Sequence, residues 1–175
     1  MTIPNNHSSV TRVEQICLFI ARLSVTAWIG AACLFVIVGV TEVTRGGFDS
    51  ATKDVLVAVR FPAFYCCGAF LVSISSIATA FARTSILIPP TFIRISFCML
   101  AIVLALMCID YIWIYGPLLQ MVLPPGSPKS AAFKVYHEAS KWINLVELAL
   151  CFVAAGLLNW PLRTLNVTSQ TSPAC

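Results

Sequence analysis

The chain has 175 residues, of which 59% are hydrophobic and only 10% are charged, and its mean hydropathy is +0.89. Soluble domains carry about 25% charged residues, so this composition excludes an ordinary soluble domain and predicts an integral membrane protein. The net charge of +4 is spread along the chain without a long run of like charges, and we therefore expect no nucleic-acid partner.

Four apolar segments follow one another along the chain, at residues 23–40, 61–81, 95–115 and 142–160. Each approaches the roughly 20 residues with which a helix crosses about 30 Å of hydrocarbon. A backbone surrounded by lipid must satisfy its own hydrogen bonds, so each segment is expected to be helical. The sequence predicts an all-α integral membrane four-helix bundle with up-down-up-down order, within a domain at residues 16–160 and between polar tails at 1–15 and 161–175.

Glycine and proline separate the predicted spans. Pro89-Pro90 lies between the second and third spans, and a glycine- and proline-rich loop at residues 116–130 lies between the third and fourth. Pro62 would stand in the first turn of the second helix, where its missing N–H has no helical partner to lose.

The topology places both termini on one side of the membrane, together with the loop at residues 82–94. That short loop contains Arg83 and Arg94 and no acidic residue. Positive charge in short loops favours the cytoplasmic side. We therefore expect cytoplasmic termini, which for a bacterial protein means the inner membrane, with the lipid bilayer as the first partner.

A polar stripe runs along the fourth span and the residues just before it. His137, Ser140, Asn144, Glu147 and Cys151 lie at offsets of 0, 3, 7, 10 and 14 residues. On a helix that begins near residue 133 they share an arc of about 80°. Polar groups that face lipid stay unpaired, so this arc is expected to face the other helices.

Further polar residues are expected at the same end of the bundle. Asp110 would lie near the depth of Asn144, and Arg60 would open the second helix on that side. In one interpretation, Asp110 and Glu147 pair with Arg60 or share protons and serve only to join helices. In the other, this end holds a water-filled vestibule that binds a cation or relays protons.

Cofactor chemistry receives little support from the sequence. Seven of the eight cysteines lie in apolar stretches, where a free cysteine behaves as a small hydrophobe. Met107, Cys108 and Cys151 could supply ligands for a soft metal ion such as Cu(I), but they have no chelating spacing. The only other histidine besides His137 is His7 in the polar tail, so a haem held by two histidines of one chain is not expected. No cofactor is predicted beyond the possible soft metal ion.

Three motifs resemble those of a known family. They are "RFPAFYCCGAF" at 60–70, "IDYIWIYGPLLQMV" at 109–122 and "FKVYHEASKWIN" at 133–144. Together they are similar to the transmembrane protein 205-like family, a small four-helix membrane domain of unknown function. The resemblance implies the fold and the membrane location, and implies that Phe133, His137, Ser140 and Asn144 matter together. The remaining motif residues are Phe61, Pro62, Phe64 and Pro117.

Three functional hypotheses remain open. The first is a small protein that handles ions, protons or soft metal ions, as a homo-oligomer with a pathway between protomers. The alternative is a non-catalytic module that binds or stabilises another membrane protein, because no catalytic motif can be identified. The third is a membrane enzyme or haem protein that uses His137. An enzyme is the least expected of the three.

Overall fold

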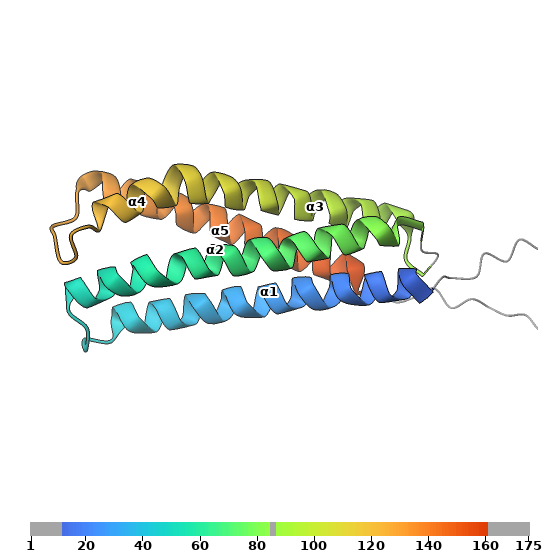
Figure 1. Ribbon diagram of the computed structural model, residues 1–175, viewed down its shortest axis with the longest axis horizontal. Coiled ribbons are helices and arrows are strands. Elements are labelled where there is room, and N and C mark those ends of the chain that lie inside the picture. The colour runs from blue at the N-terminus through green and yellow to red at the C-terminus, as the bar shows by residue number, and fades with distance from the viewer. Residues whose placement is uncertain (1–11, 85–86, 161–175) are drawn as a thin grey trace, which may run out of the picture.

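The computed structural model describes residues 12–84 and 87–160, which form an all-α bundle of four long antiparallel helical rods (Figure 1). The first two rods are single helices, the third is made of three consecutive segments, and the fourth is again a single helix. The elements are α1 (Arg12–Thr44), α2 (Ser50–Phe81), η1 (Ala82–Thr84), α3 (Pro90–Ile109), η2 (Asp110–Tyr115), α4 (Gly116–Met121) and α5 (Ala131–Leu158). The predicted four-helix bundle with up-down-up-down order is confirmed.

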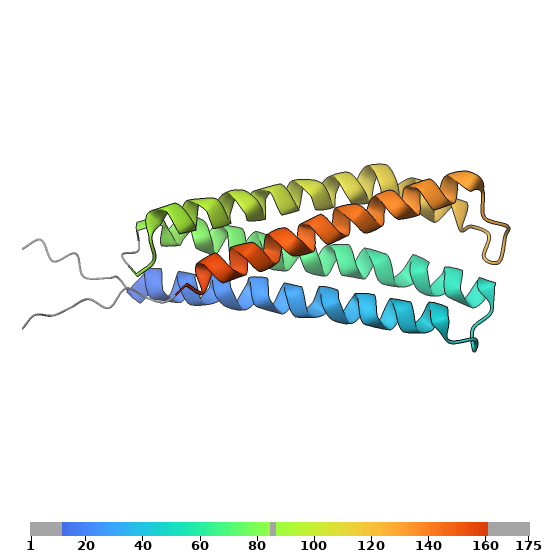
Figure 2. The same cartoon turned by 180° about the vertical axis from the view of Figure 1, so that it is seen from behind.

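The two ends of the bundle differ in what they hold. The start of α1, the end of α5 and the η1 segment lie at one end, which we call the terminal end (Figure 1). The turns that join α1 to α2 and α4 to α5 lie at the other, which we call the loop end. Figure 2 shows α5 running obliquely across the bundle, beside α1 at the terminal end and away from it at the loop end.

The surface of the bundle is suited to lipid. All four rods are long and apolar enough to span a membrane. Large apolar side chains point outward along them, among them Phe19, Leu34, Phe70, Ile112 and Phe152. A soluble bundle would place polar residues on this face. The chain is a multi-pass integral membrane protein.

The helices extend beyond the predicted spans. Both α2 and α5 begin eleven residues earlier than predicted, which adds about 16 Å of helix to each at the loop end. Side chains cap both starts, because Asp49 accepts the Thr52 N–H at 2.8 Å and Ser130 accepts the Phe133 N–H at 3.3 Å. At the terminal end, residues 12–15 were predicted to belong to a polar tail but form the first turn of α1.

Pro62 lies inside α2 and not in its first turn, so that prediction was wrong. An internal proline leaves the carbonyl four residues earlier without its helical donor. That carbonyl belongs to Ala58, and the Tyr115 hydroxyl donates to it at 3.5 Å. A neighbouring rod thus supplies the missing donor, as transmembrane helices with proline require.

The third rod also continues further than predicted. Gly116 and Pro117 do not end it, and the loop is shortened from 116–130 to 122–130. The π-helical segment η2, Asp110–Tyr115, directly precedes α4, and Pro117 takes a place in the first turn of α4. Wide π turns are rare and are frequent at functional sites. Asp110 is the first residue of this one.

Arg22 connects two rods at the terminal end. Its Nε donates to the Leu158 carbonyl at 2.7 Å. This carbonyl belongs to the last turn of α5, where helical carbonyls have no partner within the helix. The contact holds α1 against α5 at this end.

Candidate functional site

Asp110 is the centre of a buried hydrogen-bond network. Its side chain has no solvent exposure, and three donors from two other elements converge on its Oδ2 atom. The Tyr65 hydroxyl donates at 2.5 Å, the Ser140 hydroxyl at 3.0 Å and the Asn144 amide at 2.8 Å. Several donors on one carboxylate oxygen are the arrangement with which proteins hold negative charge.

Local structure explains how these side chains meet. Ser140 and Asn144 are one turn apart on α5 and therefore present their side chains on the same face. The Asn144 amide also donates to the Ser140 carbonyl at 2.8 Å, which orients the amide toward Asp110. Asp110 begins the wide η2 turn of the third rod, and Tyr65 projects from α2 one turn after Pro62.

Tyr65 was missing from the sequence prediction. It is 5% exposed, and its ring packs among Phe61, Phe64 and Tyr111, with ring centroids 5.2 to 6.4 Å away. One signal could have identified it, because a tyrosine within a predicted apolar span needs a partner for its hydroxyl when it is buried.

Two carboxylate oxygens near this network lack any hydrogen-bond partner. Within residues 12–84 and 87–160, these buried atoms are Oδ1 of Asp110 and Oε1 of Glu147. Glu147 is 3% exposed, lies one turn beyond Asn144, and is close enough to Asp110 for their charges to interact. An unpaired carboxylate inside a membrane costs several kcal/mol, so this arrangement marks a candidate site for a cation.

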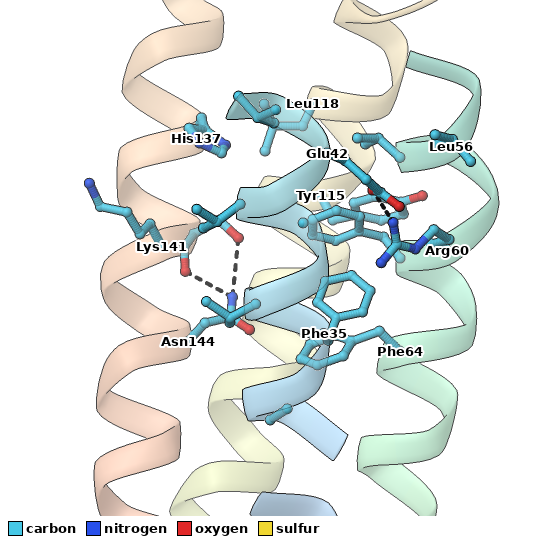
Figure 3. A pocket seen from close by; sticks show the side chains of 18 of the residues that line it. Phe35, Glu42, Leu56, Arg60, Phe64, Tyr115, Leu118, His137, Lys141 and Asn144 are labelled. Carbon is cyan, nitrogen blue, oxygen red and sulfur yellow. Dashed lines mark hydrogen bonds and ion pairs between the residues drawn. The ribbon is translucent and has the colours of Figure 1, made fainter. Parts of the chain in front are cut away.

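A cavity of about 1140 Å³ leads from the loop end to Glu147, while Asp110 is not part of its lining. Its lining includes Ser140, Asn144 and Glu147 at the inner end, and Lys53 and His137 nearer the loops. Figure 3 shows His137 and Asn144 along α5 on one side of the cavity, facing residues of the other rods. Lining residues at the outer end of the cavity lie on the first turns of α2 and α5, before the predicted spans begin. The cavity therefore extends from the loop end to the buried carboxyl group of Glu147.

Aromatic rings form much of the opposite wall. The Phe35 and Phe64 rings stack with centroids 4.3 Å apart, and Trp28 packs on Phe64 at 4.9 Å. These side chains come from α1 and α2, and all three line the cavity. The wall is therefore largely apolar and aromatic.

Arg60 does not pair with either buried carboxyl group. It forms an ion pair with Glu42, and its guanidinium lies over the Phe35 ring, 5.2 Å from the centroid (Figure 3). The interpretation in which Arg60 compensates Asp110 and Glu147 is therefore wrong. The reason is that Arg60 lies on the side of α2 that faces α1, where Glu42 and Phe35 are its neighbours.

His137 stands apart from the network. Its ring is exposed at the loop-end part of the cavity and stacks on Phe133, with centroids 5.8 Å apart and planes 4° apart. Arg45 is likewise exposed, at the end of α1. The structure thus brings Asp110, Ser140 and Asn144 together with Glu147 beside them, while His137 and Arg60 line the same cavity nearer its mouth.

The three soft-metal candidates are not brought together. Cys108 is exposed on the outside of the bundle, whereas Met107 and Cys151 are buried. Met107 packs where α3 meets α2 at Gly68, and Cys151 lies one turn beyond Glu147 on α5. Across the part of the chain that the structure describes, no group of three or more His, Cys, Asp or Glu side chains is arranged to hold a metal ion.

Comparison of the chain with protein-family models, curated proteins and solved structures gave no match. The functional interpretation therefore depends on the network, the two unpaired oxygens and the cavity.

Proposed function

We propose that this membrane protein handles small cations, the proton first among them, at the neighbouring carboxyl groups of Asp110 and Glu147. The observation that supports this proposal is the presence of two buried, unpartnered carboxylate oxygens, one on Glu147, which lines the inner end of a cavity, and one on Asp110, in the network behind that lining. A cation that enters from the loop end would reach Glu147, which lines the cavity, whereas Asp110 lies behind the lining residues Ser140 and Asn144. The donors around Asp110 keep its side chain in place while the charge nearby changes.

The position of Glu147 supports a membrane-embedded step. It lies sixteen residues into α5, about 24 Å from the loop-end start of that helix. It also lies eleven residues before Leu158, about 16 Å from the contact that joins α1 and α5 at the terminal end. A group at this depth that takes up and releases a cation is suited to transfer across the hydrocarbon layer.

Proton flux in liposomes tests the proposal. The purified protein would be reconstituted with an internal pH-sensitive dye, and a potassium diffusion potential would drive protons inward. We expect measurable acidification with the wild-type protein and flux at the level of protein-free liposomes for Glu147→Gln and Asp110→Asn. Glu14→Gln is the matched control, because Glu14 lies in the first turn of α1 at the terminal end and does not line the cavity. Wild-type flux in both test variants, with each correctly folded, would refute the proposal.

Family, orientation, cofactor and assembly belong to the same proposal. We propose membership of the transmembrane protein 205-like family, with termini in the cytoplasm and assembly as a homo-oligomer. Reporter fusions at the C-terminus test the orientation, and mass measurement in mild detergent tests the assembly. No cofactor is predicted, and elemental analysis of the same preparation tests for the soft metal ion.

A further inference from the structure

The cavity opens sideways between α1 and α5. These helices diverge from the terminal end toward the loop end, as Figure 2 shows. Along the diverging edges the cavity is lined by Val36 and Ile37 of α1 and by Trp142 and Leu145 of α5. These four side chains are 54 to 62% exposed and apolar. The rim therefore belongs to the surface that faces lipid, and a molecule dissolved in the membrane can reach the cavity without crossing water.

The positive charges that line the cavity already have partners. Arg60 is paired with Glu42, and Lys141 with Glu138. The Lys53 ammonium donates to the Val43 carbonyl at 3.3 Å. By contrast, the carboxyl group of Glu147 at the inner end has an oxygen with no partner. The charge that this end of the cavity lacks is positive.

The shape and chemistry of the walls specify the rest of the ligand. The stacked Phe35 and Phe64 rings and the Trp28 ring line the same cavity as Glu147. Aromatic faces attract cations, and most strongly organic cations that carry little water. A cavity of about 1140 Å³ is large enough for a molecule of drug size.

We infer that the cavity binds an amphipathic organic cation, which enters between α1 and α5 with its charge toward Glu147 and its apolar part against the aromatic wall. This inference rests on the proposed function, because it uses the same carboxyl group and names the ligand class that the site would take beyond the proton.

Two ions of the same shape and opposite charge test the inference. Tetraphenylphosphonium is a lipophilic cation, and tetraphenylborate is the matching anion. Binding of each would be measured by equilibrium dialysis against the full chain in lipid nanodiscs, with empty nanodiscs as the background. We expect saturable binding of the cation and no saturable binding of the anion. Equal binding of both would show that the cavity recognises only apolar bulk, and would overturn the inference.

Two pairs of variants locate the bound cation. Glu147→Gln should weaken cation binding about tenfold or more, while Glu14→Gln, at the terminal end and away from the cavity, should leave it unchanged. Gly39 lines the cavity, Gly30 does not, and both have open space where a side chain would begin. Gly39→Trp should therefore obstruct the cavity and weaken binding, whereas Gly30→Trp should not. Wild-type affinity in Glu147→Gln, or equal affinity in the two tryptophan variants, would overturn the inference.

This measurement separates the two proposals. Tetraphenylphosphonium carries no exchangeable proton, so its binding does not depend on proton transfer. Binding that depends on Glu147 together with wild-type proton flux in Glu147→Gln would refute the proton step and support the ligand. Loss of proton flux in that variant, with no saturable cation binding by the wild-type protein, would support the proton step and overturn the ligand.

Discussion

Replacing Tyr65 with phenylalanine tests whether the Asp110 network exists as a coupled unit. The change removes one hydroxyl and keeps the ring that packs among the aromatic side chains of α2 and η2. Asp110 loses its shortest hydrogen bond, at 2.5 Å, and keeps those from Ser140 and Asn144. The structure therefore isolates the energetic contribution of a single donor.

The expected loss of stability in Tyr65→Phe follows from two typical ranges of hydrogen-bond free energy. A hydrogen bond to a charged group contributes about 1.5–3 kcal/mol to stability. Hydrogen bonds between transmembrane helices average about 0.6 kcal/mol and rarely exceed about 1.7 kcal/mol. Because the Tyr65–Asp110 bond is short and Asp110 is fully buried, we expect a value near the top of the membrane range, about 1.5 kcal/mol.

A double-mutant cycle provides the measurement. The free energy of unfolding would be compared for the wild type, Tyr65→Phe, Asp110→Asn and the double variant, by reversible denaturation in mixed micelles. We expect a coupling energy of about 1 kcal/mol between the two positions. Tyr111→Phe is the matched control, because that ring belongs to the same aromatic group and its side chain is 45% exposed. A Tyr65→Phe cost no larger than that of Tyr111→Phe, or additive single effects, would contradict the geometry of the network.

Three further outcomes are expected. Gly68→Ala should destabilise the fold by about 1–3 kcal/mol, because the added methyl group would overlap side chains of α1 and α3. Gly30→Ala should not destabilise the fold, and thermal unfolding of the two variants gives the comparison. Arg60→Met should lower the stability of the fold by about 1–2 kcal/mol, because it leaves Glu42 unpaired. Adding Glu42→Gln to that variant should recover part of the lost stability in the same assay. Elemental analysis and a visible spectrum of the purified protein should show neither stoichiometric metal nor a haem band.

The predicted spans were correct in number and order because lipid imposes length and apolarity on any helix that crosses it. Hydropathy reports only the part of a helix that contacts lipid. It therefore missed the first eleven residues of both α2 and α5, where charged side chains begin to line the cavity. For the same reason it placed Pro62 at a helix start, although the helix begins three turns earlier.

Side-chain placement was predictable along each helix and not between helices. A period of 3.6 residues places Ser140, Asn144 and Glu147 on one face, and all three line the cavity. Which partner each residue meets depends on how the neighbouring helices are rotated, and periodicity within one helix contains no such information. The sequence therefore could not show that Tyr65 donates to Asp110, or that Arg60 pairs with Glu42.

The two unpaired carboxylate oxygens gain significance from how thoroughly the fold satisfies its other polar groups. The carbonyl freed by Pro62 receives the Tyr115 hydroxyl, and the last carbonyl of α5 receives Arg22. Among the described residues, the only other buried side-chain oxygen or nitrogen without a partner is the hydroxyl of Ser76. A hydroxyl left unpaired costs far less than a carboxylate. A bundle that supplies donors to stray carbonyls yet leaves Asp110 and Glu147 incomplete has kept a place for a positive charge.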